Sequence, residues 1–161
     1  MIKWSLIDWS NPDSKISRYF TVRDALWLRE WKRMGVLDDG LNDVVKCNIV
    51  LMADKLDLVQ DFLEKKILIK SWWRPLGYNA AIGGARNSTH MALEEASGVD
   101  WWTDKNGDGH LTGEDCFETK ASLMFKLEEY GIRMENNFDD ARWVHTDDKI
   151  VPPGGRRFFK P

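Results

Sequence analysis

The sequence is poor in three features that would each have pointed to a particular class of protein. Its only two cysteines, Cys47 and Cys116, lie far apart and form no Cys-x-x-Cys pair. They favour buried thiols over a disulfide framework or a cysteine-ligated metal site. No apolar run approaches the roughly 20 residues that cross a bilayer, so we expect no membrane insertion. The 23 basic and 26 acidic residues give a net charge of −3, which provides no basic field for nucleic acid.

Tryptophan, by contrast, is abundant, with nine residues in a chain of otherwise ordinary composition. Hydrophobic residues make up 43% and charged residues 30%, which is typical of a soluble globular protein. At 161 residues, the chain is long enough for one domain with a sizeable core. We expect a single domain over residues 1–161, with a lead-in at 1–18, a tail at 152–161, and some tryptophans lining a ligand-binding cleft.

Hydrophobic periodicity predicts a core built from helices and a small sheet. The expected elements are three helices, at about 21–34, 42–65 and 114–130, and four short strands, at 66–72, 99–102, 132–134 and 142–146. Thr21 and Asp24 form a capping box for the first helix, and Gly35 is expected to end it. Residues 75–90 are rich in glycine and asparagine and are expected to form a loop. This order of elements predicts an α+β fold with a small antiparallel sheet packed against helices.

The connection between the first two predicted strands collects polar side chains of different kinds. Arg74, Ser88, His90 and Asp100 supply a cation, a hydroxyl, an imidazole and a carboxylate, which is more typical of a polar site than of a core. Zinc is bound by nitrogen, sulfur and carboxylate ligands, and a catalytic site keeps three protein ligands. Spacing alone does not decide the matter, because His145 lies about 55 residues after His90 and a lone histidine is more often a surface or hydrogen-bonded residue.

A set of motifs spread over roughly residues 18–150 resembles a known family. The motifs are Arg74-Pro, Tyr78-Asn79, Gly83-Gly84-Ala85, Asn87-Ser88-x-His90, Gly98-x-Asp100 and Trp143-Val-His145-x-Asp147, preceded by a segment at 19–28. They resemble the zinc D-alanyl-D-alanine carboxypeptidase family, which includes phage endolysins and shares its fold with the Hedgehog signalling domain. The resemblance implies a Hedgehog/DD-peptidase-like fold. It also implies a zinc metallopeptidase, a hydrolase of the cell wall that cleaves peptidoglycan stem peptides as a D,D-carboxypeptidase or an endopeptidase.

The resemblance also assigns roles to individual residues. It makes His90, Asp100 and His145 the zinc ligands, Arg74 the group that steadies the substrate carbonyl or carboxylate, and Ser88 a substrate contact. Zinc lowers the pKa of bound water to about 7, and a guanidinium opposite it favours the developing oxyanion.

The choice of cleaved bond is expected to depend on the shape of the substrate pocket. We expect that pocket between Trp72, Trp73, Tyr78 and the tail, so Tyr78 is a further substrate-binding candidate.

The chain departs from the family pattern at one metal ligand. Asp100 follows His90 after ten positions, a longer interval than is usual in the family. Glu94 or Glu95 is therefore an alternative third ligand. We favour Asp100, because it keeps the strand-like context of its neighbours.

A second departure concerns the general base. Many members of the family carry an acid three positions before the last histidine, where this chain has Arg142, which cannot accept a proton. Asp140 is our candidate base, because a carboxylate needs hydrogen-bond reach more than a fixed offset. The alternative function is a non-catalytic metal-binding structural or cell-wall-binding module with the same fold, for example a virion component.

A second possible metal site lies between the second strand and the third helix. Residues 104–115 follow the EF-hand loop pattern, with Asp at the twelfth position in place of Glu. The expected calcium ligands are Asp104, Asn106, Asp108, Asp115 and the backbone carbonyl of His110. The alternative is an acidic turn that caps the third helix.

The expected setting follows from the resemblance and from the N-terminal sequence. The first residues show no apolar segment followed by a small-residue cleavage site, so we expect no signal peptide. This suits a phage-type lysis protein made in the cytoplasm that acts on the cell wall of its host. Its expected partner is the peptidoglycan peptide, with no nucleic acid, and the chain is expected to be a monomer.

Overall fold

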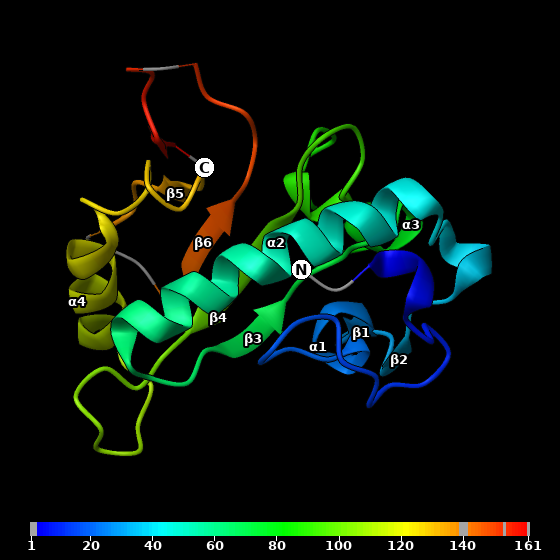
Figure 1. Cartoon of the computed structure of the whole chain (residues 1–161), viewed down its shortest axis with the longest axis horizontal. Helices are drawn as coiled ribbons and strands as arrows, with labels where there is room; N and C mark the ends of the chain where they lie inside the picture. Colours follow the sequence, from blue (N-terminus) through cyan, green and yellow to red (C-terminus); the bar gives the residue numbers. More distant parts are fainter. Residues whose placement is uncertain (1–2, 139–141, 153, 161) are drawn as a thin grey trace.

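The computed structural model describes residues 3–138, 142–152 and 154–160, and its longest element is helix α2, Asp43–Leu63 (Figure 1). The side chain of Asn42 caps this helix by accepting a hydrogen bond from the Val45 N–H at 3.0 Å. The helix buries one face at helical spacing. The buried apolar side chains of this face include Val45, Ile49, Met52, Leu56, Val59 and Leu63. The helix expected at 42–65 is therefore confirmed.

Five strands form the sheet that α2 crosses in Figure 1. In spatial order they are β3 (Leu68–Ser71), β4 (Gly98–Trp102), β6 (Val144–Asp147), β5 (Arg133–Glu135) and β7 (Phe158–Phe159). The first three pairings are antiparallel, and β7 pairs with β5 in parallel. The α+β class is therefore confirmed, but the sheet is mixed. The tail at 152–161 contributes the short strand β7 to this sheet.

The first helix is much shorter than its apolar spacing predicts. The capping box at Thr21 is present, but α1 spans only Val22–Leu26 and is followed by a hairpin of β1 (Trp27–Leu28) and β2 (Arg33–Met34). The reason is competition for backbone hydrogen bonds. The Glu30 N–H, which would continue the helix, donates to the Tyr78 hydroxyl at 3.2 Å, and the Leu26 carbonyl accepts from the Gly35 N–H at 2.8 Å.

Two further expectations about helices need correction. Residues 75–90 are not all loop, because they contain α3 (Leu76–Ala81) and the start of the 3₁₀ helix η3 (Thr89–Met91). Helix α4 covers Gly113–Leu123 and ends well before residue 130. Phe117 on α4 and Phe125 beyond its end are exposed. Two more 3₁₀ helices, η1 (Trp4–Leu6) and η2 (Leu37–Asp39), complete the described elements.

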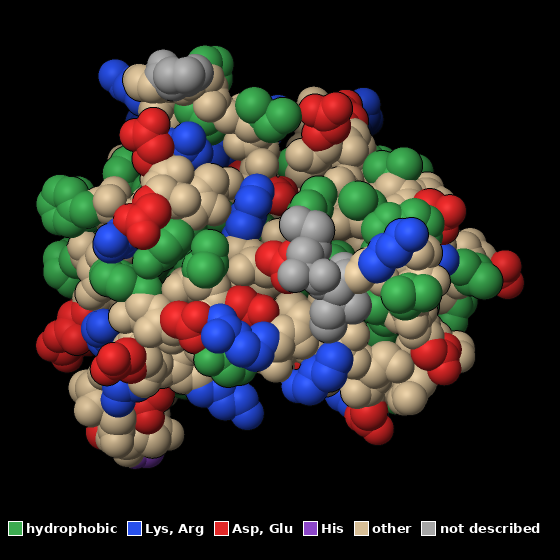
Figure 2. Space-filling view, in the orientation of Figure 1, with side chains coloured by type: hydrophobic (Ala, Val, Ile, Leu, Met, Phe, Trp, Pro, Cys, Tyr) green, Lys and Arg blue, Asp and Glu red, His purple; other side chains and the backbone are tan. Residues whose placement is uncertain are grey.

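Two observations concern the charge of the surface and the character of the helices. In the face shown in Figure 2, acidic and basic side chains are interspersed and form no extended patch of one sign. Within the described ranges, no helix combines the length and the apolar character needed to cross a bilayer.

Candidate metal centre

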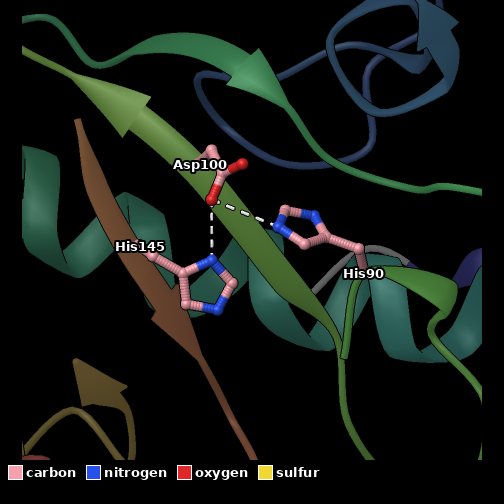
Figure 3. Close-up of side chains that lie close together, drawn as sticks. All are labelled: His90, Asp100 and His145. Atoms are coloured by element: carbon pink, nitrogen blue, oxygen red, sulfur yellow. Dashed lines mark hydrogen bonds and ion pairs between the residues drawn. The ribbon is translucent and has the colours of Figure 1, made fainter. Parts of the chain in front are cut away.

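Three side chains from distant parts of the chain meet at the middle of the sheet (Figure 3). Asp100 on β4 and His145 on β6 are directly opposite each other in the antiparallel register. His90 reaches the same point from η3. Close cross-strand placement follows from the pairing of β4 with β6, so the sheet itself holds two members of the group together.

The three side chains converge on one carboxylate oxygen. Asp100 Oδ1 lies 2.7 Å from His145 Nδ1 and 3.1 Å from His90 Nε2. All three side chains are largely buried, with at most 9% of any of these residues exposed. In the part of the chain that the structure describes, no other cluster of three His, Cys, Asp or Glu side chains could hold one ion.

The hydrogen bond on the far side of the His90 ring fixes which nitrogen carries its proton. His90 Nδ1 lies 2.7 Å from the carbonyl oxygen of Trp72, and a carbonyl only accepts hydrogen bonds. Nδ1 is therefore the N–H, and Nε2 presents a lone pair to Asp100 Oδ1. Metal-binding histidines characteristically donate their other N–H to a carbonyl or carboxylate in this way. A cation between Nε2 and the carboxylate satisfies both acceptors.

The protonation of His90 and Asp100 also favours a bound cation. Burial lowers the pKa of His90, which keeps the imidazole neutral near pH 7. Burial alone would raise the pKa of Asp100, but the neighbouring His90 and His145 hold it well below its ordinary value. Two imidazoles with one carboxylate are a ligand set that zinc accepts, so these residues fit a zinc ion.

The long interval between His90 and Asp100 is ordered by a residue that the sequence did not bring to notice. The chain turns through left-handed conformations at Ala92 and Glu94, with φ values of 52° and 59°. The buried Asn48 side chain on α2 donates to the carbonyls of these two residues at 2.9 and 3.0 Å. The turn leaves Glu94 and Glu95 exposed, outside the convergent group. The geometry therefore favours Asp100 over either glutamate.

Arg74 binds the other oxygen of the central carboxylate. Its guanidinium forms an ion pair with Asp100 Oδ2, and its Nε donates to the Ser71 hydroxyl at 2.9 Å. The Arg74 N–H donates to the His90 carbonyl at 2.8 Å, which ties the segment that carries the arginine to η3. The guanidinium is thus fixed beside the candidate metal ligands.

A pocket of about 600 Å³ adjoins Asp100 and Arg74. Tyr78 lies on its wall with its ring edge-on to Trp31 at a centroid distance of 5.2 Å. Trp72 and Trp73, which were expected to shape the substrate pocket, are instead buried in the core. The tryptophans that line it are Trp31 and Trp143. Trp31 lies between β1 and β2, in the hairpin that replaces the helix expected at 21–34, and it is exposed.

The remaining catalytic and substrate candidates are not gathered in this pocket. Ser88 caps η3, where its hydroxyl accepts from the His90 N–H at 3.3 Å, and it lines a separate pocket of about 1030 Å³. Asp140, the candidate base, lies outside the described residues. Arg142, which stands at the position of the missing acid, is exposed.

The loop at 104–115 is organised by its own backbone. Asp104 accepts hydrogen bonds from the N–H groups of Gly107, Asp108 and Gly109 at 2.6–3.1 Å. Asp115 forms a capping box with Thr112 at the start of α4 and also accepts from the N–H groups of residues 105 and 106. These contacts agree with the alternative interpretation of the loop, an acidic turn that caps the third helix.

The calcium assignment gains no support from this geometry. In the described residues, the carboxylates of the loop form no convergent group of three possible ligands. The side chain of His110 is exposed at the surface of the loop, away from His90 and His145.

Comparison with known proteins identifies one relationship. A family model described as Peptidase M15 matches residues 25–145, which is more than half of the chain and includes His90, Asp100 and His145. No curated protein and no solved structure matches the chain.

We expect the chain to bind one zinc ion and to lose it when a converging ligand is removed. His90→Ala, Asp100→Ala and His145→Ala should each weaken zinc binding by more than the about 10–100-fold that follows from losing a residue that only orients a ligand. Titration calorimetry and metal analysis after dialysis measure this. His110→Ala is the matched control, because it removes the third histidine of the chain. Equal losses in all four variants would contradict the assignment.

We expect the contribution of the loop at 104–115 to stability to be independent of calcium. Because the Asp104 carboxylate accepts three backbone hydrogen bonds, Asp104→Ala should lower the thermal unfolding midpoint. The loss should be the same in calcium buffer and in chelator, as measured by circular dichroism. A loss confined to the calcium buffer would restore the calcium site.

Proposed function

The chain belongs to the peptidase M15 family, and we propose that it is a zinc-dependent peptidase that cleaves the stem peptides of peptidoglycan. The family supports a metallopeptidase, and the convergent ligand set supports zinc. We further propose that the chain forms one Hedgehog/DD-peptidase-like domain, with the α+β arrangement of Figure 1 as its framework.

The observation that carries this proposal is the approach of His90 Nε2, which is an acceptor in the tautomer whose Nδ1–H donates to Trp72, to a buried carboxylate oxygen at 3.1 Å. Two acceptors this close, out of water, are unfavourable unless a proton or a metal ion lies between them. A proton on Nε2 is disfavoured, because burial lowers the pKa of His90. His90, Asp100 and His145 would hold a zinc ion there, which would relieve the conflict and would supply Lewis-acid activation of water and of the scissile carbonyl.

We propose that Arg74 acts on the substrate. Its ion pair with Asp100 and its bond to Ser71 hold the guanidinium at the edge of the 600 Å³ pocket. A peptide carbonyl bound in this pocket next to Asp100 meets a fixed positive charge, which stabilises negative charge developing on its oxygen. Because the guanidinium is oriented before the substrate arrives, little reorganisation is needed during the reaction.

The general base of the reaction is also a proposal. We keep Asp140 in this role, since it comes shortly before His145 in the sequence and a carboxylate is the group the chemistry needs. Arg142 cannot take that role.

A second candidate function is favoured by the presence of Arg142 where many members of the family carry an acid. A chain that binds zinc without an effective base would be a structural or cell-wall-binding module of the same fold. As part of the first proposal, the peptidase, we further propose that the protein is of phage origin and takes part in lysis by acting on the cell wall of its host.

The enzyme proposal is tested on purified peptidoglycan. The zinc-loaded chain should release peptide fragments, chelation should abolish the release, and added zinc should restore it. Arg74→Ala should lower kcat/KM by about 10²–10³-fold, the usual cost of one oxyanion-stabilising donor. His110→Ala should retain wild-type activity. Absence of fragments from a chain that carries one zinc ion would reject the enzyme and leave the module.

A further inference from the structure

The strand that leads to Arg74 contains an irregularity beside the metal centre. In the pairing of β3 with β4, Ile69 lies opposite Trp101 and Ser71 lies opposite Asp100. Lys70 is therefore the extra residue of a β-bulge. Bulges interrupt the alternation of side chains between the two faces of a sheet and are frequent next to active sites. As a result, the consecutive residues Lys70 and Ser71 both line the 600 Å³ pocket.

The Lys70 ammonium lies against aromatic rings without an acidic partner. Its Nζ is 3.0 Å from the centroid of the Trp143 ring and 5.5 Å from that of Trp102. Within the described ranges, no carboxylate lies within ion-pair distance of it. Burial lowers the pKa of Lys70. The ammonium has therefore lost water and gained cation–π contacts, and among the described residues it has no neutralising anion.

Among the described residues that line the pocket, the basic side chains outnumber the acidic ones. Arg29, Lys70 and Arg74 line it together with two acids, Glu30 and Asp100. Asp100 is already committed to Arg74 and to the two histidines. The pocket is therefore suited to a ligand that brings a negative charge of its own.

Trp143 connects this cation to the metal centre. It immediately precedes β6, two positions before His145, so the same strand carries the support of Lys70 and a candidate zinc ligand. On β3, which β4 separates from β6, the bulge residue Lys70 comes directly before Ser71, which pairs with Asp100. The spacing between the ammonium and the metal centre is thus set by the sheet rather than by a loop.

We propose that Lys70 is a specificity-determining residue that binds a carboxylate on the leaving residue of the substrate peptide. This inference rests on the proposed peptidase function and names the substrate feature that the pocket selects. The carboxylate has two possible sources, the C-terminal α-carboxylate of the peptide or a side-chain carboxylate of an internal residue. Lys70 supplies a charge-assisted hydrogen bond to either, and Trp143 holds the ammonium in place.

Three N-acylated peptides with the same residue on the acyl side of the scissile bond test the proposal on the zinc-loaded full chain. The first ends in D-alanyl-D-alanine with a free carboxylate, and the second is its C-terminal amide. The third is also an amide, but its leaving residue is D-glutamate with a side-chain carboxylate. We expect the wild type to prefer the first or the third over the second, and the preferred peptide identifies the source of the carboxylate.

Lys70→Met should lower kcat/KM on the preferred carboxylate peptide by about 10–100-fold, the value of one charge-assisted hydrogen bond. The loss on the neutral amide should be much smaller, so the selectivity falls. Lys70→Arg should restore most of the selectivity, because a guanidinium keeps the charge and also stacks on indole. The control is Lys66→Met, which removes an exposed lysine just before β3.

Two outcomes would overturn the assignment of Lys70. One is equal cleavage of all three peptides by the wild type, and the other is an equal loss on all three in Lys70→Met. If the wild type cleaves none of them, the peptidase function fails on its own. Binding of the same peptides, measured by tryptophan fluorescence, then decides the role of Lys70, and equal affinity for the carboxylate peptides and the neutral amide rejects it.

Discussion

The buried carboxylate of Asp100 is the interaction on which the rest of the site depends. One oxygen faces the imidazoles of His90 and His145, and the other faces the guanidinium of Arg74. A charge this deeply buried is costly unless it is fully paired, so each partner has to be held in position. The β4–β6 register holds His145, and the Trp72 carbonyl holds the His90 ring. The sheet and α2 supply the rigid frame for these contacts.

The sequence predicted the elements whose own hydrogen bonds and packing decide their structure. Helix α2 has a strong cap and a long, regular apolar face, and it appears as expected. The helix expected at 21–34 has a cap and a similar apolar spacing, but most of it is replaced by a hairpin. The difference is tertiary, because the Tyr78 hydroxyl, 48 positions after Glu30, takes the N–H that would have extended the helix. Local pattern carries no information about such a partner.

The residues of the candidate site also fall into those that the sequence indicated and those that it did not. Motif resemblance pointed to His90, Asp100 and His145, and the structure brings these three together. It did not point to Lys70, which stands in the apolar run Ile67-Leu-Ile-Lys-Ser and looks like a lysine on the open face of a strand. Its position in the pocket follows from a bulge against β4, some 30 residues later in the sequence, and from the ring of Trp143. The register between distant strands is set by the folded sheet. The position of Lys70 in the pocket could therefore not be predicted from a single lysine in a strand pattern.

The most direct test of this account is the position of the metal in crystals of the zinc-loaded protein, measured by anomalous scattering at the zinc edge. The account predicts one peak bound by His90 Nε2, His145 Nδ1 and a carboxylate oxygen of Asp100 at about 2.0–2.2 Å, with the His90 Nδ1–H still on the Trp72 carbonyl. A peak at Glu94 or Glu95 would contradict it. So would a zinc-loaded crystal in which the three side chains bind one another and no metal lies between them.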